Sequence, residues 1–168
     1  MHRRTVAVLA CAALLILLIV PYARAGQTWN RYPNNPVLRT SASGWDSVHI
    51  TEPFVLDDES EYKMYYTAWG GPTATSIGLA TSADGIVWTK HADNPIFRPR
   101  AGAWDSFSVN ALSILKEDGV YRMWYSGDDG ASSGIGYATS QDGVTWVRLS
   151  EPVLRQTAGA WDQGSITA

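Results

Sequence analysis

Cysteine is almost absent from this 168-residue chain, and the single one, Cys11, lies within an apolar N-terminal run. A folded part that begins after this run has neither a disulfide nor a cysteine-based metal site, so its core must hold it together. The 3.6-residue periodicity of amphipathic helices is lacking as well. We therefore predict an all-β fold, no cofactor and no metal.

An excess of basic residues is also lacking: 13 Lys and Arg stand against 16 Asp and Glu, a net charge of −3. Without Arg3, Arg4 and Arg24, 10 basic residues remain against 16 acidic ones, a net charge of −6. This balance favours neither a nucleic acid nor an anionic membrane as partner. We expect no nucleic-acid partner and no membrane association other than an N-terminal anchor.

Residues 1–25 have the layout of a secretory signal peptide. A basic start, "MHRR", precedes fifteen apolar residues at 6–20, and Ala23 and Ala25 occupy the −3 and −1 places of a small-residue cleavage site. The apolar run is shorter than the ~20 residues that a membrane-spanning helix needs. We predict a secreted or periplasmic protein, with an uncleaved N-terminal anchor as the alternative.

Aromatic residues are abundant, with eight Trp and eight Tyr, and they recur at a fixed spacing. "YKMYYTA" at 62–68 returns as "YRMWYSG" at 121–127, and Trp45, Trp104 and Trp161 mark steps of 59 and 57 residues. A period of this length with strand-like content predicts the blades of a β-propeller. Aromatic residues at this density suit a β-sheet core, and they also suit a surface that binds carbohydrate.

Each unit is predicted to contain four antiparallel strands. The expected strands are 47–56, 62–68, 76–82 and 86–91 in the first unit, and 106–115, 121–127, 134–140 and 144–149 in the second. Asp-Gly between the third and fourth strands is a strong hairpin signal. We expect blade units at about 35–93 and 94–150 and an incomplete third unit at 151–168, so that residues 26–168 form part of a propeller, either as the N-terminal part of a longer protein or as a truncated gene product.

The pattern DG-x-YRMWYSG … IGYATS-x-DG-x-x-W … PVL resembles the five-bladed β-propeller glycosidases of the glycoside hydrolase family 43, 32 and 130 type, over residues 34–168. The resemblance implies an axial funnel lined by the first, inner strand of each blade. Two carboxyl groups in such a funnel hydrolyse a glycosidic bond. "SQDGVTW" at 140–146 also resembles the Asp-box turn of sialidases, although one residue is missing between Asp142 and Gly143.

The resemblance implies that the acids come from inner strands, often immediately before a proline, and Glu52 precedes Pro53. Glu52 also departs from the repeat, because its counterparts are Ala111 and Ala168. We predict Glu52 as a catalytic or substrate-contacting carboxylate, the alternative being a strand-end Glu that faces solvent. Since the other two units lack a carboxylate at this position, we expect the chain alone to be inactive.

Four further residues are candidates for substrate binding: His49, Asn110, Asp46 and Asp105. His49 and Asn110 depart from the repeat, and His49 is alternatively a hydrogen-bonded structural residue. Strict alternation would place His49 and Glu52 on opposite faces unless a bulge intervenes. Asp46 and Asp105 recur beside Trp in each unit, which favours a structural corner where the carboxylate caps backbone amides.

Three functions are compatible with these observations. The favoured one is a secreted, glycoside hydrolase-like protein that acts on a carbohydrate in the funnel. The alternatives are a non-catalytic carbohydrate-binding propeller and a propeller scaffold for protein contacts, because one fold hosts many functions. The acidic stretches 57–61 and 128–129 lack the spacing of a hand-type calcium loop and are expected to be solvated turns.

Overall fold

The computed structural model describes residues 29–71 and 74–168, and the predicted signal peptide lies outside this part. The chain divides into two compact units, Met1–Pro33 and Asn34–Ala168. All nine elements of the described residues are β-strands, as predicted, and all of them belong to the second unit. No helix in the described ranges has the length and apolar character needed to cross a bilayer.

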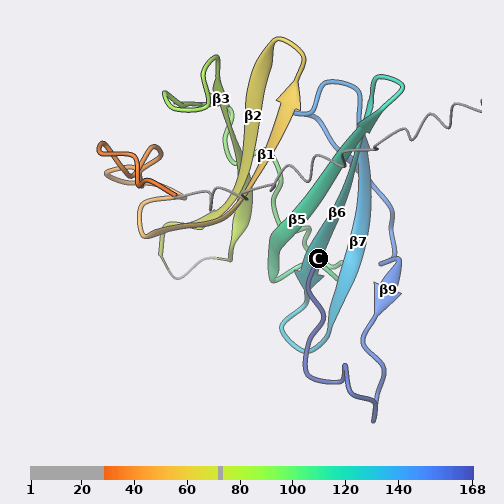
Figure 1. Ribbon diagram of the computed structural model, residues 1–168. Helices are drawn as coiled ribbons and strands as arrows, with labels where there is room; N and C mark the ends of the chain where they lie inside the picture. The colour runs from red at the N-terminus through yellow and green to blue at the C-terminus, as the bar shows by residue number, and fades with distance from the viewer. Residues whose placement is uncertain (1–28, 72–73) are drawn as a thin grey trace, which may run out of the picture. The chain divides into compact units, whose positions relative to one another are not determined.

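The first sheet contains four antiparallel strands in the order of the sequence: β1 (His49–Asp58), β2 (Glu61–Trp69), β3 (Ser76–Ser82) and β4 (Thr89–Lys90). The second sheet repeats this order with β5 (Ser108–Glu117), β6 (Val120–Asp128), β7 (Ser133–Ser140) and β8 (Val147–Arg148). A short strand, β9 (Leu154–Arg155), also pairs with β7 (Figure 1). The structure thus has the meander of two propeller blades, with outer strands of only two residues each.

A β-bulge interrupts the first strand of each sheet at the same place. In the first sheet the register moves from Thr51 opposite Thr67 to Phe54 opposite Tyr65. In the second sheet it moves from Asn110 opposite Ser126 to Leu112 opposite Tyr125. The extra residue changes the direction of the side chains that follow it, so simple alternation does not hold along β1 and β5.

The turn between the third and fourth strands has the same hydrogen bonds in both sheets. Asp84 Oδ1 accepts the backbone N–H groups of Ile86 and Val87, both at 2.8 Å. Asp142 Oδ1 accepts those of residues 144 and 145, both at 2.7 Å. Burial would raise the pKa of Asp142, but these amide hydrogen bonds outweigh it and lower the pKa to about 2. The Asp-Gly hairpins predicted from the sequence are therefore present.

The two sheets pack face to face over a shared core. Tyr65 of β2 faces the second sheet, while its neighbour Tyr66 belongs to a separate cluster on the other face. The Tyr65 hydroxyl donates to the Gly143 carbonyl of the second sheet at 2.9 Å. The buried residues of the shared core are Tyr65, Ile77, Leu79, Phe97, Val109, Leu112, Ile114, Tyr121, Met123, Tyr125 and Ala138. Burial of this apolar surface is what joins the blades.

A buried polar cluster supplements the core at the C-terminal ends of β1 and β5. Asp58 pairs with Lys63 Nζ at 2.6 Å within the first sheet, and with Lys116 and the Tyr121 hydroxyl of the second sheet. Burial would raise the pKa of Asp58, but the hydrogen bonds from Lys116, Lys63 and Tyr121 together hold it well below its usual range. Asp58 therefore connects the two blades through its carboxylate.

The segment that follows each sheet adds to the edge of that sheet's third strand. Phe97 forms a bridge with Ile77 of β3, and the side-chain amide of Asn94 binds the backbone N–H and C=O of Leu79 at 2.9 and 2.8 Å. β9 adds to β7 in the corresponding way. Each repeat unit thus begins on the sheet of the unit before it.

Candidate functional site

Glu52 lies in the bulge of β1 and its side chain is exposed. Its φ angle is +49°, in the left-handed region that residues other than glycine rarely adopt. The bulge occurs at the same place in both first strands, but only in the first does it carry a carboxylate. The backbone therefore presents Glu52 in a strained conformation, which is a feature found often at functional sites.

His49 lies at the start of β1 and is exposed, and its ring stacks on Trp69 of β2. The ring centroids are 4.5 Å apart and the planes differ by 14°. The equivalent pair in the second sheet is Ser108 and Asp128, which face each other across β5 and β6. The two blades therefore present different chemistry at the same position: an imidazole on an indole in one, and a hydroxyl on a carboxylate in the other.

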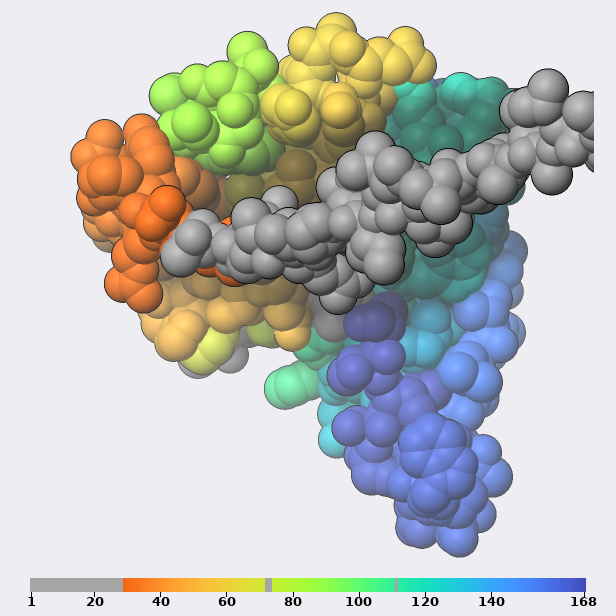
Figure 2. Space-filling model, viewed as in Figure 1, coloured from red at the N-terminus to blue at the C-terminus, as the bar shows by residue number. Residues whose placement is uncertain are grey.

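The start of the third unit forms one wall of a cavity against the second blade. The Ile166 N–H donates to Ser133 Oγ at 3.2 Å, and the Ala168 N–H donates to Ser126 Oγ at 2.7 Å. Figure 2 shows these last residues, in dark blue, against the second sheet. In the same way the Val109 N–H of the second unit donates to the carbonyl of Thr75, the residue before β3, at 3.3 Å. The start of the third unit thus contacts the second blade much as the start of the second unit contacts the first blade.

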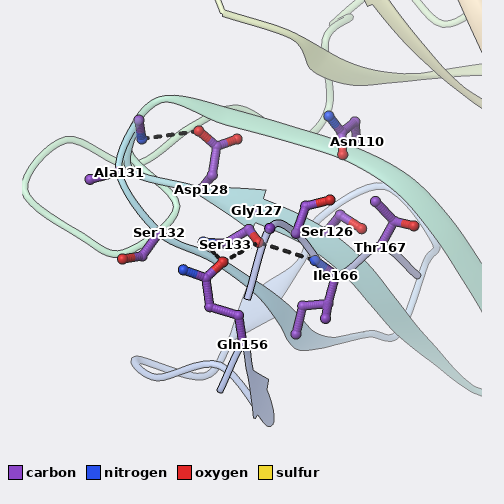
Figure 3. Close-up of a pocket in the computed structure, with 13 residues that line it drawn as sticks. Asn110, Ser126, Gly127, Asp128, Ala131, Ser132, Ser133, Gln156, Ile166 and Thr167 are labelled. Carbon is purple, nitrogen blue, oxygen red and sulfur yellow. Dashed lines mark hydrogen bonds between the residues drawn. The ribbon is translucent and has the colours of Figure 1, made fainter. Parts of the chain in front are cut away.

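The cavity is open to solvent and has a volume of about 310 Å³ (Figure 3). Its lining residues are Asn110, Ser126, Gly127, Asp128, Gly130, Ala131, Ser132, Ser133, Gln156, Gly164, Ser165, Ile166 and Thr167. Of the site residues predicted from the sequence, Asn110 lines this cavity, whereas Glu52, His49, Asp46 and Asp105 do not.

Two lining residues, Asp128 and Gln156, were not predicted from the sequence as site residues. Asp128 Oδ1 accepts the Gly130 N–H at 3.0 Å, and Oδ2 accepts the Ser108 hydroxyl. Gln156 Oε1 accepts the Ser133 hydroxyl at 3.2 Å. A departure from the repeat could have identified Asp128, because Trp69 is its counterpart. Gln156 carries no such signal.

Asp46 and Asp105 are buried within their own blades. Asp46 pairs with Lys90 Nζ at 2.5 Å. Asp105 Oδ2 accepts from Arg148 at 2.7 Å and from the Tyr125 hydroxyl at 2.9 Å. We predicted that these carboxylates cap backbone amides. Their side-chain bonds differ from that prediction, because the partners are a lysine, an arginine and a tyrosine on the strands of the same blade. Burial first, and then the Asp105 charge, raise the pKa of Tyr125.

The chemistry of the cavity is that of hydroxyl, amide and carboxylate groups around one small volume. Such groups bind the hydroxyls of a sugar through hydrogen bonds, since each can accept and most can also donate. No group of three or more His, Cys, Asp or Glu side chains in the described ranges is arranged to hold a metal ion.

No protein-family model matches the chain. Two uncharacterised proteins of Mycobacterium tuberculosis, from strains CDC 1551 and H37Rv, are each 29% identical to it over 154 residues. These alignments cover 88% of this chain but 50% of each relative. The chain therefore spans about half the length of the curated relatives that it matches.

Several solved structures are similar. A candidate glycoside hydrolase from Parabacteroides distasonis has a TM-score of 0.66 at 19% identity, over 80% of this chain and 44% of that one. A glycosyl hydrolase from Bacteroides ovatus has a TM-score of 0.65 at 22% identity, over 81% and 43%.

A third similar structure comes from the GH130 family of mannoside phosphorylases, which contains glycoside hydrolases that target β-1,2-mannosidic linkages in Candida mannan. It has a TM-score of 0.62 at 20% identity, over 79% of this chain and 42% of that one. Identities this low show the fold alone. The chain thus has the fold of the β-propeller glycosidases and spans less than half of each of these solved chains.

Proposed function

We propose that this chain binds a carbohydrate at the N-terminal ends of its inner strands, β1 and β5, as part of a secreted glycan-processing protein of the glycoside hydrolase type. The observation that carries the proposal is Glu52, an exposed carboxylate held at a φ of +49° on a β-bulge immediately before Pro53. A proline favours extended backbone in the residue before it, and the φ of Glu52 departs from that preference. The equivalent positions of the other two units hold alanine, so the blade repeat itself does not require a glutamate there.

The differences between the two blades also support a binding surface at the N-terminal ends of β1 and β5. Packing requires the same residues in every blade, whereas chemistry requires different ones. His49 with Trp69, and Ser108 with Asp128, occupy equivalent positions at this end of the sheets and differ in kind. The exposed imidazole on an indole supplies a polar edge beside an aromatic ring, and Asp128 supplies an acceptor for hydroxyls.

Hydrolysis of a glycosidic bond needs a second carboxyl group besides Glu52, one to protonate the leaving oxygen and one to activate water or attack the sugar. The equivalent inner-strand positions of the described second and third units are Ala111 and Ala168. The proposal therefore assigns to this chain one carboxylate and part of the binding surface, and it predicts glycan binding without turnover by the chain alone. The same alanines favour the second candidate function, a propeller that binds carbohydrate without cleaving it.

The test is isothermal titration of the 168-residue chain with neutral oligosaccharides of xylose, arabinose, mannose and fructose. We expect at least one series to bind. Glu52→Gln should weaken that binding at least tenfold and leave the melting temperature within a degree or two. Glu59→Gln, in the exposed turn after β1, is the matched control and should bind as the parent does. Failure of every series to bind would overturn the proposal, and full binding by Glu52→Gln would remove Glu52 from the site.

A further inference from the structure

The geometry points to a subsite for one neutral sugar residue in the 310 Å³ cavity, where the carboxylate of Asp128 selects against sugars that carry an acidic group. This inference rests on the proposed function, because it takes the ligand to be a glycan. It adds the class of sugar and the residue that selects it.

The walls of the cavity match the surface of a sugar ring. Hydroxyl and amide side chains come from β5, β6, β7 and the C-terminal segment, and Ile166 supplies an apolar contact for a C–H face (Figure 3). The volume lies at the lower end of the range for small-molecule sites, which begins at about 300 Å³. A single ring is therefore the unit that fits.

The charged side chains of the cavity lining are of one sign, negative. Asp128 is its one carboxylate, and none of the described residues that line it is a lysine, arginine or histidine. The partners of the Asp128 oxygens are the Gly130 amide and the Ser108 hydroxyl, both uncharged. No cation of the lining therefore compensates the charge of this carboxylate.

Each Asp128 oxygen also retains acceptor capacity, since a carboxylate oxygen has two lone-pair sites and each of these two donors occupies one of them. A sugar hydroxyl can donate to such an oxygen. The carboxylate of a uronic acid cannot donate, and it meets the like charge of the half-buried Asp128 carboxylate. The same carboxylate thus attracts neutral sugars and repels acidic ones.

The test compares two oligosaccharides that differ only at C6, a hydroxymethyl series and the matching uronic acid series, by titration against the 168-residue chain. We expect the parent to bind the neutral series at least tenfold more tightly. Asp128→Asn keeps the shape and the acceptor for the Gly130 amide, and should reduce this preference to about threefold or less. Asp129→Asn is the control, because Asp129 caps the amides of residues 131 and 132 and does not line the cavity.

The outcomes separate the two proposals. If neither series binds, the proposed function is wrong. If glycans bind but the parent shows no preference, or Asp128→Asn keeps it, the subsite inference is wrong and the proposed function stands. Because a variant can fail to fold, the parent is also titrated by NMR. The side-chain amide signals of Asn110 and Gln156 should shift with the neutral sugar, and unchanged signals would overturn the assignment of the cavity.

Discussion

The place of its left-handed backbone, inside a strand, distinguishes Glu52 from the other acidic residues that the structure describes. Glu52, Glu59 and Asp118 are the non-glycine residues with positive φ in the described ranges, at +49°, +59° and +51°. Glu59 and Asp118 occupy the equivalent turns after β1 and β5, where a left-handed residue closes a hairpin. Glu52 lies within a strand, where no turn requires such a conformation.

Replacing Glu52 by glycine should therefore raise stability while it removes function. Left-handed backbone costs an L-residue roughly 1–2 kcal/mol, and glycine removes this strain. Glycine also has more conformational freedom in the unfolded chain, which offsets part of the gain in stability. We expect Glu52→Gly to raise the free energy of unfolding by about 0.5–1 kcal/mol, measured by urea denaturation, and to weaken glycan binding at least tenfold. Glu59→Gly should also stabilise the chain but leave binding unchanged. A loss of stability in Glu52→Gly would show that the position is not strained.

Comparison of the repeats predicts one residue of the cavity, Asn110, and misses Asp128 and Gln156. Asn110 was predicted, as Glu52 and His49 were, because it differs from its counterparts in the other units. Asp128 was missed because it precedes a second aspartate and a glycine, as turn residues do. Only the register of β6, which extends to Asp128 opposite Ser108, shows that its side chain belongs to the strand. Gln156 enters the cavity through the path of the C-terminal segment, which no local pattern specifies.

At the scale of elements, the two Asp-Gly hairpins differ in what covers them. Gly85 and Gly143 both have positive φ, +73° and +74°. A Cβ on Gly85 would approach the Tyr62 ring no closer than 3.8 Å, whereas a Cβ on Gly143 would lie 2.6 Å from the Tyr65 hydroxyl of the other blade. The same turn is thus a free surface loop in the first blade and a blade contact in the second.

Alanine at these two glycines should separate the strain of the turn from the packing between blades. We expect Gly85→Ala to destabilise by about 1–2 kcal/mol, from backbone conformation alone. Gly143→Ala should destabilise by a further ~1–3 kcal/mol, because it also displaces Tyr65 from the core. Thermal or urea unfolding of the pair measures the difference. Equal losses would mean that the second hairpin does not pack against the first blade in solution.

The strands themselves were predictable to within about two residues, because the hairpin turns and alternating aromatic residues fix them locally. The exceptions are the outer strands, predicted as six residues each but observed as Thr89–Lys90 and Val147–Arg148. The edge of the third strand is instead shared with the segment that starts the next unit. That sharing depends on long-range pairing, which a single unit of sequence does not show.

At the scale of the whole molecule, one ion pair occurs twice in different surroundings. Asp58 and Lys63 pair across the β1–β2 hairpin, and Glu117 and Arg122 pair across the β5–β6 hairpin at 3.2 Å. The second blade covers the first pair with Lys116 and Tyr121, so the Asp58 side chain is only 6% exposed. The Glu117 side chain is 61% exposed. A blade that covers Glu117 as the second blade covers Asp58 would make the two pairs equivalent.

This difference predicts how strongly each pair stabilises the chain. Asp58→Asn leaves Lys63 and Lys116 without their shared carboxylate in a mostly buried site, and removal of one partner from such a pair costs about 3 kcal/mol or more. Glu117→Gln removes an exposed pair, and should lower the free energy of unfolding by less than ~1 kcal/mol. Urea denaturation at pH 7 measures both variants. Similar losses would show that the second blade does not cover Asp58.

The effect of Asp58 should also depend on pH in a definite direction. Its folded-state pKa lies below the ordinary value of about 3.9 that the unfolded chain has, so the folded state favours the ionised form. The stability it contributes is therefore fully present above about pH 5, and it is lost as the pH falls below about 4 toward the folded-state pKa. The gap in unfolding free energy between the parent and Asp58→Asn should be constant from pH 7 to 5 and should narrow between pH 4 and 2. A gap that widened on acidification would mean that the folded state raises the pKa of Asp58, and the carboxylate would then not be the bond between the blades.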